Sequence, residues 1–241
     1  MQFRSRWSSL VTTGLASLVA FNAAAAQSGS LAMDTRSNLY LAGGNAYEFT
    51  PTGGVGLAPT AISLNAGTGR VLSLSAFGSA FFCGPSLCGT TTPDGPAIGS
   101  TNINGMGRIG GISAPTSGFL AAVFLGPSLP SSLPTHNVVS SIDDLSYAPE
   151  LGQVFFVGDG YTSGSLLQQF LVPDGATEMY FGIADGFTFS GNPDFYDDNI
   201  GTYNIEYAVN GNSTPVSEPQ TLALLTLGFV ALGVVRKLRL G

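Results

Sequence analysis

The chain has 241 residues and a formal net charge of −7, with 8 Lys and Arg against 15 Asp and Glu. This balance leaves no basic patch that could displace the counterions of a phosphate backbone, which excludes nucleic-acid binding. Residues 109–217 hold eleven carboxylates and no Lys or Arg, so these acids are either solvated at the surface or partly neutralised by a cation.

Residues 1–26 have the pattern of a secretory signal peptide. Arg4 and Arg6 form a basic start, residues 10–21 are mostly apolar, and the alanines at 24–26 offer a cleavage site before Gln27. The apolar run is short and ends in small residues, which favours a cleaved signal over an uncleaved membrane span. We therefore expect an exported protein whose folded part starts near Gln27, long enough for one domain with a full core.

The body that follows predicts an all-β fold. Residues 27–60 are expected to form a loose lead-in over 27–38 and the first strands, and residues 61–210 a β-sandwich domain. Period-two alternation between turn-rich stretches is typical of half-buried antiparallel strands, and no segment shows a helical period. The nine expected strands are 39–41, 47–49, 61–64, 71–77, 119–125, 154–157, 166–172, 178–184 and 202–209. Short strands without helices favour a sandwich or a barrel.

The only two cysteines, Cys83 and Cys88, predict a small disulfide loop in an exported protein. Such a short loop would pin one loop tip and add little global stability. A zinc site is the weaker alternative, because it needs more ligands than two cysteines and the distant His136.

Residues 84–118 and 127–137 are rich in Gly, Pro, Thr and Asn and are expected to be long surface loops. Residues 105–110 fit G-x-G-x-x-G, but no βαβ pattern surrounds them, so we interpret the match as chance. His136 would have to serve as the base of any catalytic triad, yet no G-x-S-x-G elbow accompanies it.

The most informative stretch is the segment between the last two expected strands. It holds Asp185, Asp194, Asp197, Asp198 and Asn199. Carboxylates this close repel one another unless they are solvated or hold a hard cation, and Ca²⁺ accepts carboxylate, amide and carbonyl oxygens in irregular loops. The spacing does not fit an EF-hand. Calcium binding and a solvated acidic loop both remain open from the residues alone.

This stretch also resembles a known family. The order strand, Gly-Ile-x-Asp, loop, Asp-Asn-x-Gly-x-aromatic-x-Ile is similar to LecA-type bacterial galactose lectins, with shorter matching blocks at 69–85, 118–126 and 154–160. The resemblance implies a galactose-binding-like jelly-roll β-sandwich with one Ca²⁺ at the loop joining its last two strands. By position it implies Asp185, Asp198 and Asn199 as ligands through their side chains, and Cys83 through its backbone carbonyl.

Two departures limit what the resemblance implies. The loop from Asp185 to Asp198 is longer than in the lectins, so their threonine carbonyl ligand has no counterpart here beyond guesses at Asp194 or Phe195. The lectins' sugar-contacting His-x-x-Gln pair has no match between residues 84 and 118. Galactose specificity is therefore not implied. Phe195 and Tyr196 are either stacking faces for a sugar or, as we favour, side chains that pin the loop.

Two carboxylate pairs offer an enzymatic alternative. Asp197 with Asp198, or Asp185 with Glu206, could serve as the acid and base of a glycoside hydrolase. Adjacent aspartates at a strand end normally point apart, so we expect a protein that is not an enzyme.

The C-terminal end predicts a membrane segment. After a polar stalk over 211–215, residues 222–235 are apolar or small and would rise roughly 21 Å as a helix, enough for a thin membrane span with flanking residues. The cations that close it favour a cytoplasmic end and place everything before it outside. These cations are Arg236, Lys237 and Arg239.

The whole of 216–241 resembles the PEP-CTERM sorting signal of Gram-negative bacteria. The motif here is Val216-Ser217-Glu218-Pro219, with Ser217 where the family usually has proline. The resemblance implies recognition by a membrane-embedded exosortase, an inner-membrane intermediate, and a final place at the cell surface or in the extracellular matrix. An ordinary tail anchor without processing is the alternative.

The sequence therefore predicts an exported, non-enzymatic β-sandwich between a signal peptide and a C-terminal transmembrane helix. It would bind Ca²⁺ and, weakly, a glycan such as an extracellular polysaccharide. The alternatives are a structural surface or matrix protein without a ligand, and a glycan hydrolase that uses the acidic loop.

Overall fold

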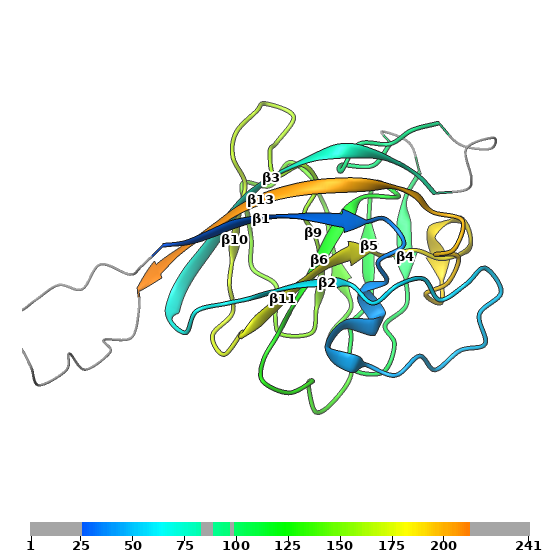
Figure 1. Cartoon of the computed structure of the whole chain (residues 1–241), viewed down its shortest axis with the longest axis horizontal. Coiled ribbons are helices and arrows are strands. Elements are labelled where there is room, and N and C mark those ends of the chain that lie inside the picture. The colour runs from blue at the N-terminus through cyan, green and yellow to red at the C-terminus, as the bar shows by residue number, and fades with distance from the viewer. Residues whose placement is uncertain (1–25, 83–88, 97–98, 213–241) are drawn as a thin grey trace, which may run out of the picture.

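The described part of the chain is an all-β sandwich, as the sequence predicted (Figure 1). The computed structural model describes residues 26–82, 89–96 and 99–212. Within these residues the helical elements are two short 3₁₀ turns, η1 (Leu39–Gly44) and η2 (Phe187–Phe189). All other regular elements are strands, which form three sheets.

The largest sheet has five strands in the order β1-β13-β3-β10-β8. Its members are β1 (Gln27–Asp34), β13 (Ile200–Asn212), β3 (Thr68–Phe81), β10 (Gln169–Leu171) and β8 (Ser146–Tyr147). The long strands β13 and β3 alternate inward apolar with outward polar residues, which is the pattern of a sheet with one solvated face. β1 lies antiparallel to β13, with Gln27 opposite Val209, so the start of β1 and the end of β13 lie together (Figure 1).

A four-stranded sheet packs against the inner face of this one, in the order β2-β11-β6-β9. Its members are β2 (Thr60–Ser63), β11 (Glu178–Ile183), β6 (Leu120–Leu125) and β9 (Val154–Phe156). All six residues of β6 are buried. This burial on both faces explains why its sequence, LAAVFL, is an unbroken apolar run without alternation.

A third, smaller sheet covers the far side of the second one together with η1. Its order is β12-β4-β5-β7, with β12 (Ser190–Gly191), β4 (Thr101–Ile103), β5 (Ile112–Ala114) and β7 (Asn137–Val138). The molecule therefore has two apolar cores, one on each face of the central four-stranded sheet.

Two of the strand predictions are wrong. Residues 39–41 belong to η1, because the Asn38 side chain accepts a hydrogen bond from Tyr40 N at 2.9 Å and caps a helical turn. Residues 47–49 form no strand.

The opposite error occurs at 27–38, where we expected a loose lead-in and the structure has β1. The first half of β1 holds Ser28, Gly29 and Ser30, and Met33 is its one fully buried residue, so its alternation is weak in the sequence. The expected loop over 84–118 contains β4 and β5, and the first residues of the expected stalk at 211–215 belong to β13.

Several predictions lie outside the described residues. These are the signal peptide up to residue 25, the pair Cys83 and Cys88, and the tail from residue 213, including the sorting motif and its basic end. Within the described ranges no helix is long and apolar enough to cross a membrane.

Candidate functional site: a carboxylate and amide cluster at the acidic loop

The acidic loop, Asp185–Asn199, connects β11 to β13 and lies at the opposite end of the sandwich from Gln27 and Asn212 (Figure 1). Asp185 follows the end of β11 by two residues, and Asn199 comes directly before β13. Because β11 and β13 belong to the two sheets that enclose the first core, both ends of the loop rest on rigid elements.

Two of the four aspartates in this loop serve to hold another loop in place. Asp194 Oδ2 accepts hydrogen bonds from Thr52 N at 2.8 Å and from Thr52 Oγ1 at 2.7 Å, and its Oδ1 accepts from Gly53 N and Phe195 N. Asp197 Oδ1 accepts from Gly56 N at 3.2 Å. Partial burial works to raise the pKa of Asp194, but these donors outweigh it and hold that pKa below its usual value.

The partner of these aspartates is the Thr52–Gly56 segment, and it must be glycine-rich to approach so closely. A Cβ on Gly53 would lie 2.3 Å from the Phe195 ring, and one on Gly54 would lie 2.1 Å from the Asp197 carboxylate. Gly54 also has a φ of +95°, which disfavours other residues. The TGG sequence at 52–54 is therefore explained by contact with the acidic loop.

The other two aspartates and the asparagine keep buried oxygens without a hydrogen-bond donor among the described residues. Asp185 is 1% exposed, and while its Oδ1 accepts from Gly186 N at 2.7 Å, its Oδ2 has no such partner. Asn199 is 2% exposed; its Nδ2 donates to Thr35 O at 3.1 Å, which leaves Oδ1 unpartnered. Asp198 Oδ1 is also buried and unpartnered.

The charged forms of both carboxylates are unfavourable at these positions. Burial raises the pKa of Asp185 well above its usual value, the neighbouring Asn199 amide and Gly186 N–H lower it in part, and the charges of Asp198 and Asp194 raise it further. Burial likewise raises the pKa of Asp198, and Asp197 adds to this effect. Buried, unpaired carboxylates are costly to a fold, so the cluster favours binding of a proton or a cation.

Oxygen atoms from two carboxylates and one amide are the ligand types that Ca²⁺ prefers. The cluster supplies only part of the six to eight oxygens that Ca²⁺ takes, so the remainder would come from backbone carbonyls and water. Within the described residues no three His, Cys, Asp or Glu side chains gather as a metal site on their own. Phe82, directly after β3, lies beside the acidic loop, with its ring centroid 6.0 Å from that of Phe189. Cys83 lies outside the described residues.

The four aromatic residues of the loop differ in burial: Tyr196 is buried, Phe189 and Phe195 are half-buried, and Phe187 is exposed. Tyr196 is fully buried and pins the loop, which is the role we favoured for it. Phe187 is 67% exposed, and its ring centroid lies 5.2 Å from that of Phe195. An exposed phenylalanine four residues after a strand gives no distinct sequence signal.

The backbone of the acidic loop is strained. Thr188, Phe189 and Phe195 have φ values of 52°, 56° and 68°. Among the described non-glycine residues, Ser165 is the fourth with a positive φ. Bulky residues rarely adopt this conformation, and such strain tends to cluster at functional sites.

The structure separates one pair of the hydrolase alternative. Asp185 is buried at the end of β11, whereas Glu206 points outward from the solvated face of β13. Asp197 is exposed and bonded to Gly56, while Asp198 is half-buried.

Two further motifs find simple structural roles. Residues 105–110 form a tight turn in which Met106 and Ile109 exchange backbone hydrogen bonds, and no helix follows it in the described chain. His136 Nε2 lies 2.8 Å from Ser113 Oγ, which in turn donates to Asn102 Oδ1. The sequence had given His136 no partner.

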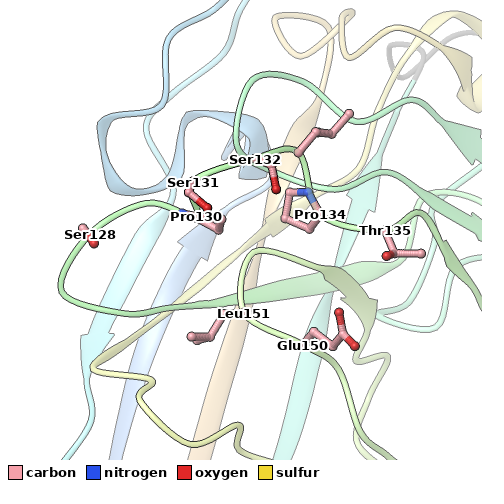
Figure 2. A pocket seen from close by; sticks show the side chains of 9 residues that line it. Ser128, Pro130, Ser131, Ser132, Pro134, Thr135, Glu150 and Leu151 are labelled. Carbon is pink, nitrogen blue, oxygen red and sulfur yellow. The ribbon is translucent and has the colours of Figure 1, made fainter.

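A separate open hollow of about 380 Å³ lies between the 128–135 loop and the turn at Glu150 and Leu151 (Figure 2). Proline and hydroxyl side chains line it, with Glu150 as its single charged residue. It is distinct from the acidic loop and holds no buried unpartnered polar side chain of the described chain.

Fold and site together define an all-β sandwich with a buried carboxylate and amide cluster in the loop that joins two core strands. No protein-family model and no curated protein matches the chain. Among solved structures, the N-terminal domain of EclA, described as a PllA-like lectin, aligns with 18% identity and a TM-score of 0.34. The alignment covers 75% of this chain and 95% of that chain. These values are too low to establish a shared fold.

Proposed function

We propose that the protein is a non-enzymatic, cation-binding β-sandwich in which Ca²⁺ holds the base of the acidic loop. Asp185, Asp198 and Asn199 would supply side-chain oxygens, and bound Ca²⁺ would supply the positive charge that the cluster lacks. The observation that carries this proposal is the set of three buried side-chain oxygens without donors among the described residues. The hydrogen bonds of Asp194 and Asp197 to the Thr52–Gly56 segment point the same way, because they leave Asp185 and Asp198 as the carboxylates available to a cation.

Calorimetric titration of the full-length chain in detergent with CaCl₂ tests this proposal. We expect one site in the wild type, a large loss of affinity in Asp185→Asn, and a small change in the matched control Asp197→Asn. The Asp185→Asn variant should also have a lower melting temperature in Ca²⁺ but not in chelator. Equal losses in both media, or no heat of binding in the wild type, would contradict a metal role.

The same proposal includes export and C-terminal sorting through an exosortase, with the cell surface or matrix of a Gram-negative bacterium as destination. Support comes from the signal-peptide pattern and the PEP-CTERM-like tail. Cell fractionation with mass spectrometry of both protein termini tests both processing steps. An intact chain in the cytosol would refute export.

Weak glycan binding beside the cation is the second function that we propose. The exposed Phe187, whose ring lies beside that of the half-buried Phe195, supports it, since aromatic faces offer apolar contact to a ring while carboxylates and amides can bond hydroxyl groups. The absence of Lys and Arg from residues 109–217 favours a neutral ligand over an anionic one. A glycan array probed with and without Ca²⁺ tests it, with Phe187→Ala as the variant.

Two outcomes would point to the alternatives. Calcium binding without any glycan signal would favour a structural surface or matrix protein. Turnover of labelled polysaccharide that is lost in Asp198→Asn would favour a glycan hydrolase, against our proposal.

A further inference from the structure

Tyr196 lies in the middle of the acidic loop, and its side chain reaches back to the end of β11. Its ring is fully buried. The hydroxyl donates to Ile183 O at 3.1 Å and accepts from Asp185 N at 3.1 Å. These two backbone groups lie on either side of Ala184, so one hydroxyl fixes the backbone from which the Asp185 side chain projects.

The main chain of Tyr196 connects to the other side of the cluster. Its carbonyl accepts from Asn199 N at 3.3 Å, and its N–H donates to Gly54 O at 3.2 Å. A Cβ on Gly56 would lie 2.4 Å from Tyr196 Cβ, so the residue is also closely packed from the Thr52–Gly56 side. One residue thus joins the backbone at Asp185, the backbone at Asn199 and the neighbouring loop.

A role in filling the core would explain the burial of the ring but not the placement of the hydroxyl. A phenylalanine would fill the same volume without leaving the position polar. The hydroxyl instead makes two hydrogen bonds to the chain at Asp185, whose Oδ2 has no donor among the described residues. Groups that orient a ligand residue without touching the metal commonly change metal affinity by 10- to 100-fold when they are removed.

We propose that Tyr196 is the positioning residue of the cation site, holding Asp185 and Asn199 in the mutual arrangement that binding requires. The inference rests on the proposed function, since it assigns a residue to the same site. It also connects that site to the Thr52–Gly56 segment, because Tyr196 bonds to Gly54.

The test compares Tyr196→Phe with Tyr203→Phe in the full-length chain. Tyr203 is an equally buried tyrosine whose hydroxyl donates to Thr92 O at 3.0 Å, a residue outside the acidic loop. Both variants lose one buried hydroxyl, so both should have a lower melting temperature in chelator. Only Tyr196→Phe should weaken Ca²⁺ binding in calorimetry, by about tenfold or more.

A double-mutant comparison distinguishes a specific effect on the cation site from a general effect on folding. If Tyr196 acts through Asp185, then adding Tyr196→Phe to Asp185→Asn should produce no further loss in the melting-temperature shift caused by Ca²⁺. An unchanged Ca²⁺ affinity in Tyr196→Phe, or equal weakening in both tyrosine variants, would overturn the inference alone. A wild type that binds no Ca²⁺ would overturn the proposed function and this inference with it.

Discussion

At the scale of single residues, hydrogen bonding divides the aspartates of the acidic loop into two kinds. Asp194 and Asp197 face backbone N–H groups, whereas Asp185 and Asp198 keep buried oxygens without donors in the described chain. Residue type and spacing left a cation site and a solvated acidic loop both open here. They could not separate the two kinds, because the donors belong to residues 52–56, far away in sequence.

The raised pKa of Asp185 predicts an unusual dependence of stability on pH. In the native state its pKa lies above the unfolded value of about 4, so the folded protein binds the proton more tightly. Its contribution to stability is therefore complete below about pH 4 and is lost as the pH rises through the native pKa.

In chelator, Asp185→Asn should be as stable as the wild type near pH 4 and more stable near pH 7, as thermal melts would show. With Ca²⁺ at pH 7 the order should reverse, since the cation replaces the proton. The negative charges of Asp198 and Asp194 remain in both proteins. The difference in melting temperature between the wild type and Asp185→Asn therefore reports on Asp185 alone. Parallel pH profiles would contradict the assignment.

Asp194 should matter for stability whether or not calcium is present. Asp194→Ala removes an acceptor for three backbone N–H groups and the Thr52 hydroxyl, and we expect a loss of about 1–3 kcal/mol in the free energy of unfolding. Denaturant titration in Ca²⁺ and in chelator should give the same loss. The exposed Asp144 offers a control, since Asp144→Ala should cost little.

At the scale of elements, the central strand β6 differs from the strands whose pattern of buried and exposed residues could be predicted from the sequence. The alternation in β3 and β13 identified both, because each has one solvated face. β6 was also predicted correctly as a strand. Its unbroken apolar run, however, did not reveal that a second core packs against its other face. β4, β5 and β7, of two or three residues each, were missed because they lie in or next to stretches rich in Gly, Pro, Thr and Asn, whose composition is typical of loops.

The burial of β6 on both faces predicts that two neighbouring residues are both sensitive to truncation. Phe124 packs in the first core and Leu125 in the second. Phe124→Ala should cost about 3–5 kcal/mol and Leu125→Ala about 2–5 kcal/mol, measured by denaturant unfolding. In β13 the neighbours Ile205 and Glu206 should differ, with a large cost only for the buried Ile205. A negligible cost for Leu125→Ala would mean that the second core does not contribute to folding.

At the scale of the whole molecule, the two ends of the domain and the acidic loop lie at opposite ends of the sandwich (Figure 1). β13 connects them, and its 13 residues span about 43 Å at 3.3 Å per residue. If the tail is embedded in a membrane as we propose, the acidic loop should point away from the lipid.

Tryptophan fluorescence can measure this orientation, because Trp7 is the only tryptophan of the chain. In vesicles containing brominated lipid, a tryptophan introduced as Asn210→Trp should be quenched more than one introduced as Phe187→Trp, in a Trp7→Phe background. Equal quenching at both positions would refute the orientation.

The pairing of β1 with β13 has a consequence for how this protein is made. The first strand of the described chain finds its only neighbour in the last one, so a growing polypeptide holds β1 without a partner until nearly all of the domain has been synthesised. Contacts between distant parts of a chain also form slowly. The nascent protein therefore stays incomplete through most of translation. If the chain is exported as we propose, the five-stranded sheet should close only after the chain has crossed the membrane.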